Sequence, residues 1–364
     1  MELEFYLNLG GKYPFVPTRE EAGKTVFITT PNKYYDRLRA ERTLDDLVDN
    51  LVFAEKLGFD GLFVLEQHGS PSAVCGQSIS IISHIAALTK GIRIGTVGAI
   101  LNGYLTPLRF AEEVATIDLL SHGRYFFGLP MGVGMNYHSY GMMNPAFARE
   151  RFREAHDLLI KALTADGPFA WEGRFFNMSY VNLWPKPLQQ PHPPVWIPAA
   201  GSRESLAMAA NNHYTWLAVL NPRKVLLRNC QTFRDLCQEA GYEYDPRQIA
   251  APIDIHVAES DRQARIEAEP HVMWRIQNGL GSPFHDSFPP GHVGVASLRG
   301  MAAGGGYRSR DISTMTFDEL TEEGWIVVGS PATVAERLEQ LTSEMGAGRV
   351  CVGGDQWTMP AWMN

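Results

Sequence analysis

The sequence predicts an α/β fold, a (β/α)8 barrel. Short runs rich in Val, Ile, Leu and Phe alternate with longer segments that have the apolar spacing of amphipathic helices. Such alternation is typical of a parallel sheet with crossover helices. We count eight strand-like runs, the number that closes a barrel, whereas roughly six form an open doubly wound sheet. The length of 364 residues fits one large barrel.

The predicted strands are rich in β-branched and aromatic residues, and Gly, Pro or polar residues bound them. They are residues 4–9, 61–66, 92–100, 124–129, 195–199, 215–219, 253–258 and 349–354. A ninth extended run, 325–329, directly precedes a helical pattern. We interpret it as a short extended segment before that helix and not as one of the eight barrel strands.

The predicted helices lie between these strands. The first begins at an N-cap at Thr43 and ends at Gly58. The last begins at Ser330, with a proline in its first turn, and ends at Gly346. The others are residues 77–89, 107–120, 147–165, 204–211, 223–240 and 262–277.

We expect a single domain over residues 1–364 with two insertions, 10–42 and 279–311. The second insertion is rich in Gly, Pro and Ser and contains a Gly triplet at 304–306, which predicts a mobile loop. Ten residues follow Gly354, too few for a full eighth helix, so we expect that helix to be shortened.

Composition argues against several kinds of partner. The 32 basic and 40 acidic residues give a net charge of −8, and the basic residues form no block, so we expect neither nucleic acid nor membrane as a partner. The four Cys form no CxxC motif, and the 11 His show no HExxH spacing, so no metal site is expected. Reduced thiols and an N-terminus unlike a signal peptide favour a cytoplasmic protein.

Three stretches that follow predicted strands lack Asp, Glu, Lys and Arg: residues 67–89, 94–108 and 125–148. In a (β/α)8 barrel the functional site lies at the C-terminal ends of the strands. The sequence therefore predicts a large, neutral cavity there, with room for a flat cofactor. No GxGxxG follows the first strand and no GxxxxGK[ST] is present, so dinucleotide and P-loop motifs are excluded.

The candidate site residues follow four of the strands. They are Glu66, Gln67 and His68; Val97, Gly98 and Asn102; Met131, Gly132, Asn136, Tyr137 and His138; and Ala200, Gly201, Ser202 and Arg203. The last group is small and opens a helix, so its backbone N–H groups could bind a phosphate, with Arg203 adding charge. The alternatives are an ordinary helix cap and an arginine that points to solvent.

Residues 105–124 resemble the P-x-R-x-A-E-E…D-x-L-S-x-G-R signature of the bacterial luciferase-like flavin-dependent monooxygenases. Gly173 with residues 185–197 is similar to that family's approach to its fifth strand, and residues 328–331 to its entry to the late helix. The resemblance covers nearly the whole chain.

The resemblance implies a homodimeric (β/α)8 (TIM) barrel that binds reduced FMN supplied by a separate flavin reductase. In the family, O2 adds to the flavin to give a C4a-peroxide, which oxygenates a small neutral organic substrate. This chemistry requires a dry, closable cavity. Loop 279–311 corresponds to the mobile loop of luciferase-like enzymes and is expected to act as a lid.

The resemblance also assigns catalytic and cofactor-binding positions. Gln67 stands where the family has its first, catalytic His, and an amide cannot act as acid or base. His68 matches the second His and is assigned to proton handling. Met131 stands where luciferase has a phosphate-binding Arg, so phosphate binding is expected to rest on residues 200–203. Residues 97–98 match the family's non-prolyl cis peptide.

Two other functions stay open. One is a coenzyme F420-dependent oxidoreductase of the same superfamily; the other is a non-catalytic flavin-binding barrel, which the loss of the first His favours. Baeyer–Villiger oxidation, hydroxylation and heteroatom oxidation are not distinguished. Insertion 10–42 has two interpretations, an aromatic wall of the substrate pocket or surface cover. The residues that would form such a wall are Tyr13, Phe15, Tyr34 and Tyr35.

Overall fold

A computed structural model of the chain describes most of its residues. These are residues 2–14, 16–18, 20–22, 28, 30–139, 144–219, 221–279, 283–295, 298–299 and 312–353. The Gly triplet 304–306, Phe15 and all residues beyond 353 lie outside this set. The predicted lid hinge and the shortened eighth helix are therefore outside the described residues as well.

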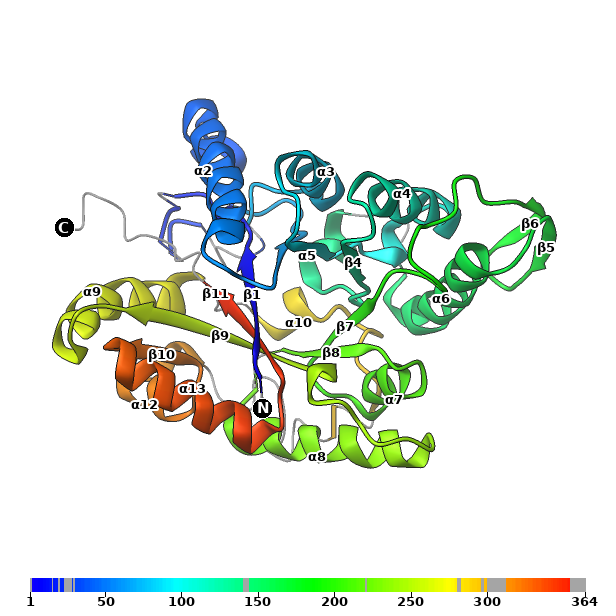
Figure 1. The fold of residues 1–364 in the computed structure, drawn as a ribbon. Coiled ribbons are helices and arrows are strands. Elements are labelled where there is room, and N and C mark those ends of the chain that lie inside the picture. The colour runs from blue at the N-terminus through cyan, green and yellow to red at the C-terminus, as the bar shows by residue number, and fades with distance from the viewer. Residues whose placement is uncertain are drawn as a thin grey trace.

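Eight parallel strands in the described part of the chain form a closed barrel, which confirms the predicted fold class (Figure 1). In ring order they are β1 (Glu4–Leu9), β2 (Gly61–Leu65), β3 (Arg93–Val97), β4 (Tyr125–Gly128), β7 (Val195–Ala199), β8 (Thr215–Ala218), β9 (Ile249–Val257) and β11 (Arg349–Gly353). The ring closes where β11 pairs with β1, with Tyr6 opposite Cys351. Barrel closure removes the exposed strand edges that an open sheet would leave.

The barrel interior is filled by large rings. Tyr6, Phe63, Phe126 and Trp196 pack in one layer, with Phe126 stacked on Trp196 at a centroid distance of 4.7 Å and Tyr6 edge-on to Phe126 at 5.6 Å. A Cβ on Gly95 would overlap the Phe126 ring, so this strand needs glycine where the ring crosses it. The centre is thus a packed core rather than a pore, and a ligand must bind at one end.

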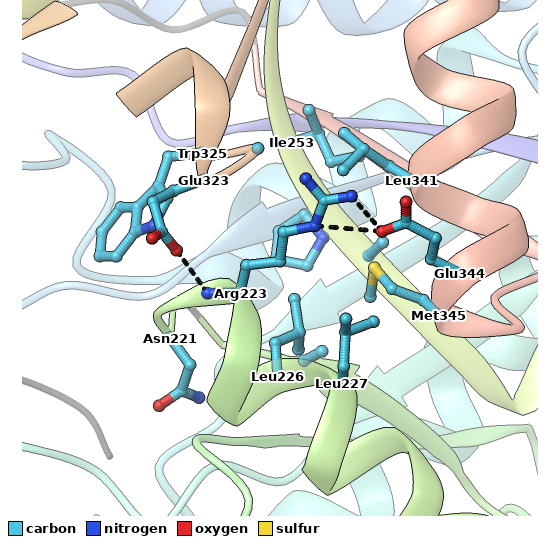
Figure 2. A pocket seen from close by; sticks show the side chains of 14 residues that line it. Asn221, Arg223, Leu226, Leu227, Ile253, Glu323, Trp325, Leu341, Glu344 and Met345 are labelled. Atoms are coloured by element: carbon cyan, nitrogen blue, oxygen red, sulfur yellow. Dashed lines mark hydrogen bonds and ion pairs between the residues drawn. The ribbon is translucent and has the colours of Figure 1, made fainter. Parts of the chain in front are cut away.

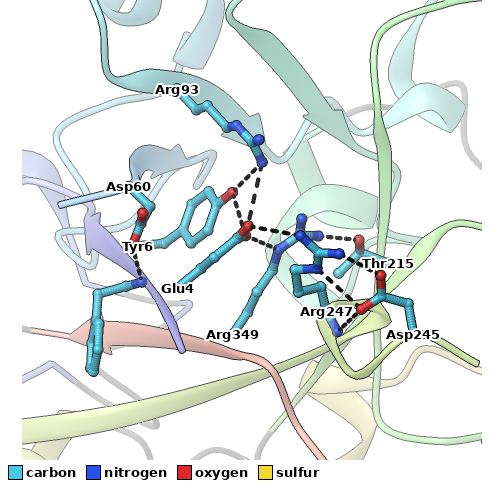
Figure 3. Close-up of polar contacts among 9 residues, drawn as sticks. Glu4, Tyr6, Asp60, Arg93, Thr215, Asp245, Arg247 and Arg349 are labelled. Atoms are coloured by element: carbon cyan, nitrogen blue, oxygen red, sulfur yellow. Dashed lines mark hydrogen bonds and ion pairs between the residues drawn. The ribbon is translucent and has the colours of Figure 1, made fainter. Parts of the chain in front are cut away.

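A charged network closes the N-terminal end of the barrel (Figure 3). Arg349 Nε donates to Glu4 Oε2 at 2.7 Å and Arg349 Nη1 donates to Thr215 Oγ1 at 2.7 Å. Tyr6 OH donates to the same Glu4 oxygen at 3.3 Å, and Arg93 Nη1 donates to Tyr6 OH at 3.2 Å. Burial acts to raise the pKa of Glu4, but Arg349 and Arg93 outweigh it and hold this pKa below its ordinary value. This end of the barrel is a structural seal.

Helices surround the barrel in Figure 1. The longer ones are α2 (Arg37–Lys56), α3 (Ser78–Leu88), α4 (Pro107–Leu120), α6 (Ala148–Thr164), α7 (Arg203–Asn211), α8 (Arg223–Glu239), α9 (Asp261–Trp274) and α13 (Pro331–Met345). Apart from the start of α2, these bounds agree with the predicted ones to within a few residues. Their apolar faces pack with the outward side chains of the strands into one cluster of buried residues.

The predicted start of the first long helix is wrong. Helix α2 begins six residues earlier than Thr43, after Asp36, whose carboxylate accepts from Arg39 N at 2.9 Å. Thr43 lies inside the helix, where its hydroxyl donates to Arg39 O at 2.7 Å. Thr can satisfy its hydroxyl on the preceding turn of a helix, so its capping preference does not fix a boundary. The first insertion is shorter than 10–42 by the same residues.

The run 325–329 contains a true strand. Strand β10 (Ile326–Gly329) is short and precedes α13, but it pairs in parallel with β9, with Ile326 opposite Asp254, which the interpretation as an unpaired extended segment did not include. Strand β9 is longer than expected, and its C-terminal half offers the backbone groups that β10 uses. Strand β10 lies beside the ring and is not one of the eight strands that close it.

Several short elements were not anticipated. Strands β5 (Phe169–Glu172) and β6 (Asn177–Val181) form an antiparallel hairpin outside the barrel. The short helices are α5 (Gly134–Ser139), α10 (Phe284–Ser287) and α12 (Phe317–Glu322). The 3-10 turns are η1 (Asn32–Tyr34), η2 (Leu101–Gly103), η3 (Pro145–Phe147), η4 (Pro246–Gln248) and η6 (Ile312–Thr314), and η5 (Arg275–Gly279) is π-helical.

The expected cis peptide between Val97 and Gly98 is not found. The cis bonds recorded among the described residues all precede proline, at Pro168, Pro185 and Pro191. Non-prolyl bonds prefer the trans form by about 3–4 kcal/mol.

Within the described residues, no helix is long and apolar enough to cross a membrane. In that part of the chain, no three His, Cys, Asp or Glu side chains gather as metal ligands.

Candidate functional site

Glu66 is the centre of the polar contacts that follow β2 and β3. Its carboxylate is buried, with Oε1 2.9 Å from His68 Nε2 and Oε2 accepting from Ser78 Oγ at 3.0 Å. A Cβ on Gly98 would lie 2.5 Å from Glu66 Cβ, so only glycine lets the chain after β3 approach this closely. Because β2 and β3 are neighbours, three predicted site residues, Glu66, His68 and Gly98, lie together at the C-terminal end of the barrel.

Buried amide groups without partners gather at this same end. Each has a polar atom that is shielded from solvent and has no hydrogen-bond partner in the described part of the structure. They follow or end β1, β2, β3, β4 and β8, and are Asn8 Oδ1, Gln67 Oε1, Asn102 Oδ1, Asn136 Nδ2 and Asn221 Oδ1. Such atoms cost about 1–3 kcal/mol each unless water or a ligand satisfies them. This end of the barrel is therefore suited to a polar but uncharged ligand.

In each of the two amides at predicted site positions, one polar atom makes a hydrogen bond and the other makes none. Asn102 Nδ2 donates to Ala148 O at 3.0 Å, which leaves its oxygen without a partner. Asn136 Oδ1 accepts from Val133 N at 2.8 Å, which leaves its nitrogen without one. One amide thus offers an acceptor and the other a donor. A flat heterocycle with neutral N–H and C=O groups along its edge, such as the flavin ring, matches this set.

The described part of the second insertion lies against the segment after β4. Tyr137 OH is 2.6 Å from His292 Nδ1, and both side chains are buried. Burial, with the charge of Arg149 added, lowers the pKa of His292 to about 4, and burial raises the pKa of Tyr137. His138 is exposed, and its Nε2 lies 3.2 Å from Asp286 O. The described residues 283–295 therefore contact the segment that follows β4.

The N-terminus of α7 carries the small residues predicted to bind phosphate. Ser202 is its N-cap and accepts from Ser205 N at 3.2 Å, and Gly201 has a φ of +94°. A Cβ on Gly201 would overlap the amide of Asn229, so this turn depends on glycine. Asn229 Nδ2 in turn donates to Ala200 O at 3.1 Å.

The arginine nearest this turn in sequence points elsewhere. Arg203, whose side chain is 66 % exposed, pairs with Glu239 of α8 at 3.0 Å. Arg149, at the start of α6, reaches across to Glu204 at 2.9 Å, and Arg153 binds the same carboxylate. The cations at the start of α7 thus come from a different helix. Arg149 lacks a motif of its own, so sequence reasoning missed it, along with Asn8, Asn221 and His292.

Three further predicted residues shape the backbone and the packing near the mouth. Met131 is partly buried against Ile100, Tyr137 and Ala148. Gly132 has a φ of +84°, which turns the chain after β4. Val97 is buried in the barrel core beneath the mouth. None of these side chains brings charge to the site.

A cavity of about 520 Å³ lies beside Gln67 and His68. The first insertion forms its other wall with Tyr13, Tyr34 and Tyr35. Of the two interpretations of this insertion, the structure supports a pocket wall. The volume is in the range of small-molecule sites.

A second, much smaller cavity lies where β8 and β9 part (Figure 2). Its volume is about 30 Å³, room for one or two water molecules. Arg223 closes it: its backbone N donates to Glu323 Oε2 at 2.7 Å and its Nε to Glu344 Oε2 at 3.0 Å. Apolar side chains of α8 and α13 line the rest, as Figure 2 shows. We interpret this cavity as a packing defect where β8 and β9 separate, and not as a ligand site.

Comparison with known proteins adds a family and a set of folds. The family model described as luciferase-like monooxygenase matches residues 25–348. Over 286 residues the chain is 26 % identical to 2,5-diketocamphane 1,2-monooxygenase 2 of Pseudomonas putida, covering 73 % of this chain and 74 % of that protein. The chain spans only about half the length of several other curated relatives that it matches.

Among solved structures, the oxygenating constituent of 3,6-diketocamphane monooxygenase from Pseudomonas putida, a type II Baeyer–Villiger monooxygenase in complex with FMN, superposes with a TM-score of 0.72. The two are 18 % identical, and the match covers 98 % of this chain and 92 % of the other. An F420-dependent secondary alcohol dehydrogenase, in complex with an F420–acetone adduct, gives a TM-score of 0.69 at 17 % identity, covering 97 % and 94 %. At these identities the structures share the fold and nothing finer.

Proposed function

The chain belongs to the luciferase-like monooxygenase family, and we propose that it is the oxygenase of a two-component flavin-dependent monooxygenase that uses reduced FMN and O2 to oxygenate a small neutral organic substrate. We further propose that a separate flavin reductase supplies the reduced FMN and that the chain works as a cytoplasmic homodimer. The relative with FMN, which is named as an oxygenating constituent, supports the two-component arrangement.

The observation that carries this proposal is the set of buried amides without partners around the barrel mouth. A flavin ring has neutral N–H and C=O groups along one edge, and Asn102 and Asn136 offer one acceptor and one donor toward such an edge. Burying these amide atoms is costly unless a ligand of this kind completes their hydrogen bonds. The residues present therefore fit the ring.

We assign the flavin phosphate to the start of α7. The backbone N–H groups after Gly201 and the helix dipole favour an anion there, and Arg149 adds a cation. Glu204 lies in the same turn, but Arg149 and Arg153 both bind it, so the cluster keeps a net positive charge. Arg203, paired with Glu239, is not part of this assignment.

When bound, reduced FMN supplies the two electrons with which one atom of O2 enters the substrate and the other leaves as water. His68 lines the adjacent cavity and is the residue we assign to proton transfer there. Glu66 holds the His68 ring through Nε2 and is a positioning residue. Residues 283–295, packed against Tyr137 and His138, help to exclude water from the mouth.

A product-labelling experiment tests this function. The chain is supplied with FMN, NADH, a flavin reductase and ¹⁸O2, together with a panel of small ketones, aldehydes and phenols. We expect a product that carries one ¹⁸O atom. Consumption of O2 with hydrogen peroxide as the product throughout, as for free reduced flavin, would favour a non-catalytic flavin-binding protein.

The second candidate function is an F420-dependent oxidoreductase, favoured by the structural likeness to an F420-dependent alcohol dehydrogenase. F420 transfers hydride and does not need O2. Reduction of F420 by an alcohol without O2 uptake would support it over the monooxygenase.

A further inference from the structure

The cavity beside Gln67 and His68 is a built structure rather than a gap under a loop. Tyr13 N donates to Pro71 O at 2.9 Å, and Val74 N donates to Gly11 O at 2.8 Å, so backbone hydrogen bonds join the start of the first insertion to the loop after β2. Both of these segments line the cavity, through Tyr13 on one side and Pro71 and Val74 on the other. The two walls therefore keep a defined separation.

The tyrosine wall is anchored to the helix that follows it. Tyr13 is almost fully buried, and its OH accepts at 2.7 Å from the backbone N of Asp36, the N-cap of α2. The Tyr13 ring stacks on Tyr35 with centroids 5.7 Å apart and planes 22° from parallel. Tyr35 is 55 % exposed and forms the rim. Paired, nearly parallel tyrosine rings present flat surfaces on which a planar ligand can pack.

The described lining carries no Asp, Glu, Lys or Arg among its sixteen residues. These residues offer an ionised ligand no counter-charge for the hydration that it would lose, whereas an uncharged ligand needs none.

One lining residue, Gln67, carries a polar atom that indicates a specific group on the ligand. Gln67 Oε1 is shielded from solvent and has no hydrogen-bond partner in the described structure. A carbonyl oxygen only accepts, so its missing partner is an O–H or N–H donor. A ligand that supplies this donor removes the cost of the buried oxygen, and one that lacks it does not.

We propose that this cavity is the substrate pocket and that it takes a neutral aromatic molecule with a hydroxyl or N–H donor, a phenol or a related N–H heterocycle. Its ring packs on the wall of Tyr13, Tyr34 and Tyr35, and its donor binds Gln67 Oε1 after the amide turns toward the cavity. The identification of this molecule as the substrate rests on the proposed function, because His68, our proton-transfer residue, lines the same cavity. Gln67 then acts in substrate recognition, in place of a residue that handles protons.

The test compares two probes of similar size, 1-naphthol and its methyl ether 1-methoxynaphthalene. Each probe is titrated into the flavin-free full chain, and calorimetry measures its affinity. We expect 1-naphthol to bind about 3- to 10-fold more tightly than the ether, the effect of one satisfied hydrogen bond. Gln67→Leu should remove this preference, because it should lower the affinity for 1-naphthol and leave the affinity for the ether unchanged. Equal affinities for the wild-type chain, binding of neither probe, or a preference that survives in Gln67→Leu would overturn the proposal.

A matched pair of variants tests the aromatic wall. Tyr35→Ala should weaken both probes about 2- to 10-fold, the value of one aromatic contact. Tyr180→Ala removes an equally exposed tyrosine from β6, outside the cavity, and should change neither affinity. Because Tyr35 and Tyr180 are both exposed, neither variant should unfold the chain, which circular dichroism checks. A similar loss of affinity in both variants, or no loss in Tyr35→Ala, would contradict packing of the ligand on the tyrosine rings.

The outcomes separate this pocket from the proposed function. Reduced FMN is titrated independently against the same preparations. If FMN binds and neither probe does, the pocket assignment fails and the flavin function stands. If the probes bind with the expected preference and reduced FMN does not, the pocket stands and the flavin function fails.

Discussion

His68 Nε2 lies 2.9 Å from Oε1 of Glu66, and Ser78 Oγ holds the other oxygen of that carboxylate at 3.0 Å. His68 and Glu66 come from the segment after β2, and Ser78 is the first residue of α3. The contact fixes the imidazole at the rim of the tyrosine-lined cavity. A proton-transfer group needs such a fixed position more than it needs a special environment.

We therefore expect His68→Gln to lower turnover about 100- to 10,000-fold, the range for a lost general acid or base. The affinity for reduced FMN should change less than about twofold, since our assignment places no hydrogen bond between His68 and the flavin. Steady-state rates and an anaerobic flavin titration measure the two effects. The control is Ser78→Ala, which leaves the His68–Glu66 contact in place. Its turnover should fall far less than that of His68→Gln. Unchanged turnover in His68→Gln would remove this residue from the mechanism.

Arg149 and Arg203 make opposite predictions for phosphate binding. Arg149→Gln should weaken FMN binding roughly 10- to 100-fold, the effect of one charged hydrogen bond, and leave riboflavin binding unchanged. Arg203→Gln should change neither, because Arg203 pairs with Glu239 on the surface. Fluorescence titration with both flavins measures this. A larger effect from Arg203 than from Arg149 would restore the expectation drawn from the sequence.

His292 makes the stability of the chain sensitive to acid. Its pKa is about 4 in the fold because of burial, against an ordinary value of 6.5. Its contribution is fully present above pH 6.5 and is lost as pH falls toward 4, because the unfolded chain takes up a proton that the folded chain does not. Between pH 8 and pH 5 this amounts to about 2 kcal/mol.

Urea unfolding of the wild-type chain and of His292→Gln, each at pH 8 and pH 5, measures the contribution of this residue. The wild-type chain should lose about 2 kcal/mol more unfolding free energy over this interval than the variant. Equal losses would mean that His292 is not neutral and buried as described.

The network at the N-terminal end of the barrel should contribute to stability and not to activity. Glu4→Gln leaves Arg349, which is 13 % exposed, without its carboxylate. We expect a loss of about 2–4 kcal/mol in unfolding free energy, as for other partly buried ion pairs. Turnover per folded molecule should stay unchanged, since the site is at the opposite end. The surface variant Arg203→Gln should cost less than about 1 kcal/mol. A turnover defect in Glu4→Gln would show coupling between the two ends.

Local sequence patterns predicted most of the fold. Hydrophobic periodicity located the eight strands that close the barrel, because each strand buries both faces or alternates between core and helix layer. Patterns failed where two local solutions compete. Asp36 and Thr43 are both good N-caps, and only packing selects the first. The run at 326–329 becomes a strand because β9 is long enough to pair with it.

The site was predicted in part. The rule that function lies after the strands located Glu66, Asn102 and Asn136, which the structure brings to one end of the barrel. It could not find contacts between residues distant in sequence, such as Tyr137 with His292, 155 positions apart. It also favoured Arg203 because of its position in the chain, whereas Arg203 pairs with Glu239 and our proposal assigns phosphate binding to Arg149. Side-chain direction depends on neighbouring helices, which no local pattern describes.

The central claim, that the barrel mouth holds reduced FMN, is tested most directly by an anaerobic titration. Reduced FMN and reduced F420 are titrated against the full chain, and the bound fraction is followed by equilibrium dialysis. We predict saturable, one-to-one binding of reduced FMN that Asn102→Leu weakens, with little or no binding of F420. Saturable binding of F420 without binding of reduced FMN would contradict the account.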